Sequence, residues 1–128
     1  MAALNFNMEG YAFESGLKVL RDSYLAANIA LAEAEGRACD ALTSYEEDVA
    51  KTGQWIGEVD DETGCVIWDH ADHLRFDIEN SRLAAWAMRN AFVLAAYHHW
   101  ERAALVWSGN PDARFPELVA ATTRRGYS

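Results

Sequence analysis

The stretch from Asp69 to Trp107 limits the possible folds of this chain more than any other part of the sequence. It contains neither glycine nor proline over thirty-nine residues. Its apolar side chains keep returning to one side of a helix with 3.6 residues per turn. As a single helix this stretch would be roughly 58 Å long, at 1.5 Å per residue. Such a helix carries an apolar stripe that the rest of the chain, or another chain, must cover.

A second long helix is predicted from about Leu17 to Lys51, with its end at Thr52 and Gly53. Apolar residues recur there every seven positions, at Leu17, Tyr24, Leu31, Ala38 and Tyr45. Alanines fill most of the intervening layer, and small side chains let a neighbouring helix approach closely. Gly53 suits a left-handed helix end, and Gly36 is a possible kink inside the helix. Residues 1–15 are expected to form either an arm or a short irregular helix.

The connector between the two long helices runs from Gln54 to Asp69. Its β-branched and aromatic residues flank an acidic turn that ends at Gly64, which favours a small β-hairpin, with an irregular loop as the alternative. After the Ser-Gly-Asn-Pro stop at 108–111, a short helix is predicted from about Phe115 to Arg125. The sequence therefore predicts an all-α single domain over 1–128. Its two long antiparallel helices, at about 17–52 and 69–108, are joined by a loop or small β-hairpin and followed by a short C-terminal helix.

Two helices of this length cannot bury a full apolar stripe on each other. Four large side chains on the second helix would remain partly exposed, and these are Trp86, Phe92, Trp100 and Trp107. Because two-fold dimers are the commonest oligomers, we expect a homodimer that completes a four-helix bundle. A tight complex with a different chain is one alternative. A second helix that breaks near Asn90 and folds back on itself is the other.

The charge of the chain is strongly uneven. The net charge is −9, and residues 1–64 carry thirteen acidic side chains against four basic ones. The densest acidic group includes Glu58, Asp60, Asp61 and Glu62. Such a surface repels the phosphates of nucleic acid, so direct nucleic-acid binding is not expected. It favours a protein partner with a basic surface, or serves as a solvated face that keeps the chain soluble.

The composition also bears on the compartment. No apolar run approaches the length of a membrane span, and the first residues lack the pattern of a signal peptide. The two cysteines, Cys39 and Cys65, do not form a disulfide framework and are expected to be reduced. We therefore expect a cytoplasmic protein that neither spans nor binds a membrane.

Two groups of polar residues on the second long helix are candidates for chemistry. Asp69, His73 and Asp77 follow each other at intervals of four, so a divalent metal is conceivable, although a solvated helix edge explains the same spacing. His98 and Glu101 are neighbours on the helix and offer an acid–base pair, although packing against a facing helix explains them equally. No nucleophile elbow, phosphate-binding loop or Cys-x-x-Cys motif is present.

Two arginines, Arg82 and Arg89, are seven residues apart and therefore share one side of the second long helix. Arginines beside an apolar stripe need carboxylate partners. The acid-rich first helix can supply them, so we expect structural ion pairs between the two helices.

The segment Met88–Trp107, MRNAFVLAAYHHWERAALVW, resembles a long helix of the HEPN-like proteins of prokaryotic defence and toxin systems. That helix carries an arginine, an aliphatic run, an aromatic residue, often a histidine, and a glutamate. The corresponding positions here are Arg89, the run 92–94, Tyr97, His98 and Glu101. The resemblance implies a dimeric helical bundle linked to defence. In catalytic members four to six residues separate the arginine from a histidine, whereas Leu94, Ala95 and Ala96 occupy the corresponding positions after Arg89.

Taken with the resemblance, these features predict a non-catalytic, acidic, homodimeric protein that binds another protein in prokaryotic or phage defence or counter-defence. A plain dimerisation module of a larger assembly is an alternative without chemistry. One enzymatic alternative is a HEPN-type ribonuclease relative, degenerate or lacking its catalytic C-terminal part, with Arg89, His98 and Glu101 as candidate residues. The other is a metal-dependent bundle enzyme using Asp69, His73 and Asp77. No cofactor is expected.

Overall fold

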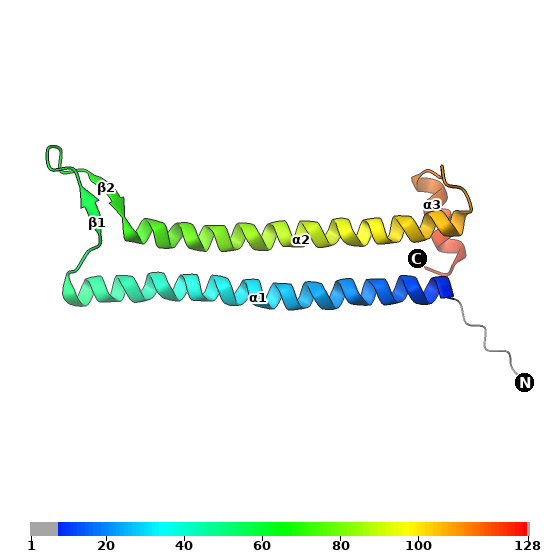
Figure 1. The fold of residues 1–128 in the computed structure, drawn as a ribbon, viewed down its shortest axis with the longest axis horizontal. Helices are drawn as coiled ribbons and strands as arrows, with labels where there is room; N and C mark the ends of the chain where they lie inside the picture. Colours follow the sequence, from blue (N-terminus) through cyan, green and yellow to red (C-terminus); the bar gives the residue numbers. More distant parts are fainter. Residues whose placement is uncertain (1–7, 128) are drawn as a thin grey trace, which may run out of the picture. The chain divides into compact units, whose positions relative to one another are not determined.

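The computed structural model describes residues 8–127 and has the predicted all-α architecture with one small hairpin (Figure 1). In chain order the elements are α1 (Met8–Thr52), β1 (Gly57–Val59), β2 (Val66–Asp69), α2 (His70–Ser108) and α3 (Phe115–Arg124). The prediction of two long helices and a short C-terminal helix is confirmed. The connector is an antiparallel β-hairpin rather than an irregular loop, with Gly57 opposite Asp69.

Three details differ from expectation or settle an alternative. The first helix begins at Met8 rather than near Leu17, so both alternatives for residues 8–15, an arm and a short irregular helix, are wrong, while residues 1–7 lie outside the described part. The second helix continues unbroken through Asn90, so the folded-back alternative is wrong. The predicted left-handed end of α1 is confirmed, because Gly53 has φ 69° and its N–H donates to the Val49 carbonyl at 2.8 Å.

The chain divides into two compact units, and both long helices contribute to each. Unit 1 contains residues 1–25 and 89–128, and unit 2 contains residues 26–88. Within each unit, the α1 segment and the α2 segment run antiparallel to one another (Figure 1).

The core of unit 1 is an aromatic cluster around Phe13, which is buried. Its ring meets Trp107 edge to face at a centroid distance of 5.0 Å and Tyr127 edge to face at 5.3 Å, and it stacks on the His99 ring at 5.3 Å. A ring nitrogen of His99 also lies 2.9 Å from the Phe13 carbonyl oxygen. Tyr127 donates a hydrogen bond to Glu14 at 2.9 Å. This cluster joins the start of α1 to the end of the chain.

Helix α3 packs on the C-terminal part of α2. The indole N–H of Trp100 donates to the Thr122 hydroxyl at 2.9 Å, and the Trp100 ring lies 5.8 Å from the ring of Phe115. Ala104 of α2 is fully buried, and Leu118 and Ala121 of α3 are nearly so. The contact covers the apolar stripe of α2 at this point. Such packing is the main source of stability for a short helix like α3.

Unit 2 is held by polar contacts around a thin core of Ala71 and Ile78. The Tyr45 hydroxyl accepts a hydrogen bond from the Ile56 N–H at 2.9 Å, which fixes the base of the hairpin. Arg82 of α2 pairs with Glu35 of α1 at 2.9 Å and with Glu79 of its own helix at 3.0 Å, although all three side chains are partly exposed. The predicted ion pairing between the helices is thus present at Arg82.

Candidate functional site

The three residues considered for metal binding are not brought together into a site. The Asp69 carboxylate accepts a hydrogen bond from the Ala71 N–H at 2.9 Å and so caps the start of α2. The His73 ring packs edge-on against Trp68 at 5.7 Å, and the Asp77 main-chain carbonyl accepts from Ser81. Within residues 8–127, no three His, Cys, Asp or Glu side chains gather in a way that could hold a metal ion.

The candidate acid–base group is not assembled into a composite site. His98 Nδ1 lies 3.8 Å from Glu101 Oε1, one turn apart on an exposed part of the same helix. Partial burial and then the Glu101 carboxylate raise the pKa of the Tyr97 hydroxyl. Arg89 takes no part in this group, and no carboxylate of the described chain pairs with it. The Arg89 ion pair predicted from the sequence is therefore not formed within residues 8–127.

The most distinctive surface of unit 2 is an exposed apolar patch on α2. Phe76, Leu83 and Trp86 are 64%, 60% and 64% exposed, and their spacing of seven and three residues places them on one side of the helix. Within residues 8–127, most of the surface of these three residues is left uncovered. We call these three residues the unit 2 patch.

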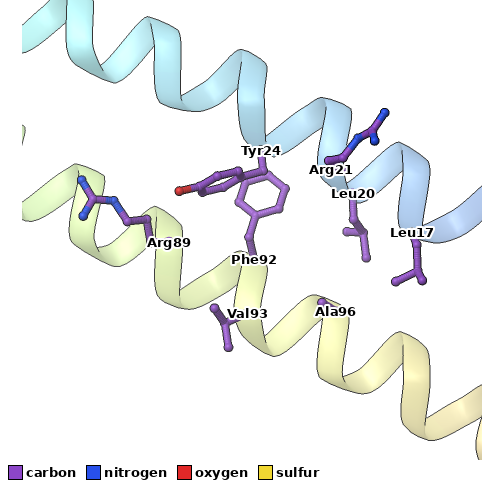
Figure 2. Close-up of a pocket in the computed structure, with 8 residues that line it drawn as sticks. All are labelled: Leu17, Leu20, Arg21, Tyr24, Arg89, Phe92, Val93 and Ala96. Atoms are coloured by element: carbon purple, nitrogen blue, oxygen red, sulfur yellow. The ribbon is translucent and has the colours of Figure 1, made fainter. Parts of the chain in front are cut away.

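Unit 1 has an open apolar groove between its α1 and α2 segments, with a volume of about 420 Å³ (Figure 2). Its lining residues are Leu17, Leu20, Arg21 and Tyr24 from α1, and Arg89, Phe92, Val93 and Ala96 from α2. The rings of Tyr24 and Phe92 meet edge to face at 5.5 Å between the helices. Val93 is 69% exposed, although it is aliphatic. We call this set of eight residues the unit 1 groove.

The side of α2 that carries Val93 continues as an apolar surface into the part of the helix on which α3 packs. From Val93 the spacing of four and three residues continues through Tyr97 and Trp100 to Ala104. At Trp100, α3 packs on this side of the helix, and Ala104 is fully buried. At Val93 and Tyr97 no element of the described chain does so, and both side chains are exposed. This side of α2 is therefore suited to a further packed helix.

The four aromatic residues predicted to face a partner behave differently from one another. Trp86 remains exposed, as part of the unit 2 patch. Phe92 packs on Tyr24 and is half-buried. Trp100 and Trp107 are also half-buried, because α3 and the Phe13 cluster cover them within unit 1. Three other residues of α2 were not predicted to face a partner but are more exposed than Phe92, Trp100 and Trp107, and these are Phe76, Leu83 and Val93. Spacing was the available signal, because Leu83 lies seven residues after Phe76 and Val93 lies seven residues after Trp86.

The acidic residues of the hairpin form a locally ordered turn. Asp60 accepts a hydrogen bond from the Glu62 N–H at 2.8 Å, and Glu58 accepts one from the Trp68 indole at 3.1 Å. Asp61 is exposed at the tip.

The division of charge follows the structural units more closely than the halves of the sequence. Unit 2 holds fourteen acidic and four basic side chains, a net charge of −10, whereas unit 1 holds six acidic and seven basic ones, a net charge of +1. The entire negative excess of the chain therefore belongs to unit 2.

Comparisons of the chain with protein families, curated proteins and solved structures found no match. Among residues 8–127, neither long helix carries an apolar segment of the length and hydropathy that crossing a bilayer requires.

Proposed function

We propose that this chain is a non-catalytic interaction protein that pairs with a second copy of itself and binds a protein with a basic surface. The observation that carries the proposal is the amount of apolar surface that the chain leaves uncovered, above all at Phe76, Leu83, Trp86 and Val93. Exposed apolar patches of this kind mark interaction sites in proteins that are otherwise well folded.

The charge of unit 2 supports the second part of the proposal. A net charge of −10 attracts basic protein surfaces and accelerates their encounter. The acidic turn at Glu58, Asp60, Asp61 and Glu62 presents several of these carboxylates on an ordered hairpin. The resemblance of Met88–Trp107 to HEPN-like proteins supports a role in prokaryotic or phage defence or counter-defence.

Two tagged versions of the chain, produced together in its own host cells, test both parts. Purification through one tag should also recover the other tagged version, because the two copies pair. The same purification should recover a basic protein, which is lost when the four hairpin acids are replaced by their amides (Glu58→Gln, Asp60→Asn, Asp61→Asn, Glu62→Gln). Recovery of neither the second copy nor an acid-dependent partner contradicts the proposal.

A further inference from the structure

We propose that two copies pair head to tail, so that the unit 2 patch of one copy packs into the unit 1 groove of the other. This inference rests on the proposed function, because it specifies the orientation of the homodimer proposed there. A two-fold dimer of this kind contains the contact twice, since each copy supplies one patch and one groove.

The two surfaces are complementary in form and chemistry. The patch projects two large aromatic side chains, Phe76 and Trp86, which are the residue types that dominate protein interfaces. The groove is concave, has a volume of about 420 Å³ and is lined mostly by apolar side chains (Figure 2). Pairing patch with patch would leave the groove uncovered, whereas pairing patch with groove covers both.

The charges of the units favour the same orientation. Pairing patch with patch would place two units with a net charge of −10 each against one another. Like charges across an interface oppose association, and screening is incomplete at contact distances because the Debye length is about 8 Å at physiological ionic strength. Head-to-tail pairing places each acidic unit 2 against a unit 1 whose net charge is +1.

Individual charged side chains near the two surfaces are also complementary. Arg89 lines the groove and has no carboxylate partner among the described residues. Asp77 follows Phe76 of the patch directly, and no cation of residues 8–127 pairs with its carboxylate. The groove therefore offers an unpaired guanidinium, and the neighbourhood of the patch offers an unpaired carboxylate.

A mixing experiment tests the orientation. Leu83→Glu disables the patch and Val93→Glu disables the groove, and both side chains are exposed, so each chain should fold by itself. A mixed dimer of the two variants would keep one intact contact. The Leu83→Glu chain supplies its unmodified unit 1 groove, and the Val93→Glu chain supplies its unmodified unit 2 patch. We expect each variant alone to weaken dimerisation at least 100-fold, and an equimolar mixture to regain dimers at concentrations where neither variant forms them.

Sedimentation velocity measures the dimers, and circular dichroism verifies that both variants keep their helices. Val106→Glu is the matched control, because this equally exposed valine of α2 lies outside both patch and groove and should leave dimerisation unchanged. Leu83→Ser and Val93→Ser replace the glutamate variants if those unfold.

The outcomes separate this inference from the proposed function. If the unmodified chain dimerises but the mixture forms no more dimer than either variant alone, the head-to-tail orientation is wrong and the homodimer stands. If neither variant weakens the dimer, another surface makes it, and the inference is again wrong. If the unmodified chain remains a monomer, both the homodimer and its orientation fail.

Discussion

Replacing Trp86 with alanine should dissociate the homodimer while leaving the fold of a single chain intact. The side chain is 64% exposed, and because a tryptophan offers at most about 250 Å², roughly 160 Å² is free for a partner to cover. Covering half of this area would contribute about 2 kcal/mol at 25 cal/mol per Å². A two-fold dimer contains Trp86 twice, so the substitution should cost roughly 4 kcal/mol, or about a thousandfold in the dimer Kd.

Sedimentation velocity over a dilution series measures this Kd directly. The control is Ile67→Ala, which removes an exposed apolar side chain from β2 of the hairpin, outside the patch and the groove. Circular dichroism should give the same helical signal for both variants, because neither side chain belongs to the core. A shift of less than tenfold, or a shift equal to that of Ile67→Ala, would refute the assignment of Trp86 to the interface.

Further predictions concern the stability of the single chain. A Cβ at Gly16 would overlap the His99 ring, so Gly16→Ala should lower the free energy of unfolding by about 1–3 kcal/mol. Gly36 has open space around it, so Gly36→Ala should raise the free energy of unfolding by about 1 kcal/mol. Urea denaturation measures both. The hydrogen bond to Glu14 and partial burial raise the pKa of Tyr127, so stability should be retained below about pH 10 and fall as the pH rises through the folded-state pKa. Tyr127→Phe should remove part of this alkaline loss, and an unchanged pH profile would contradict that assignment.

The two long helices could be predicted because their sequences lack glycine and proline over long runs and repeat apolar residues with helical spacing. The start of α1 could not. The segment Met8–Gly16 contains two glycines, at positions 10 and 16, and no seven-residue repeat, and its helix is held in place by Phe13. That side chain packs on Trp107 and Tyr127, from the far end of the sequence. Local pattern carries no information about such a contact.

The candidate site shows the same limit. Spacing placed Asp69, His73 and Asp77 along one helix edge, but their use depends on neighbours that the spacing does not specify, such as the Ala71 N–H that Asp69 caps. Likewise, Trp100 and Trp86 occupy equivalent positions in the repeat of α2. Only the placement of α3 decides that the first is covered and the second is not.

The charge distribution was only partly visible from the sequence. Dividing the chain in the middle places the acidic excess in the first half. The structure assigns residues 65–88 to the acidic unit and residues 1–25 to the other, so the contrast becomes −10 against +1. This contrast favours head-to-tail pairing, and it depends on which helix segments pack together.

Sedimentation equilibrium of the unmodified chain shows whether two copies pair. A homodimer gives a mass of about twice 14.3 kDa at micromolar concentrations, with reversible dissociation on dilution. A mass equal to that of one chain throughout the concentration range, with the helical circular dichroism signal retained, would contradict it.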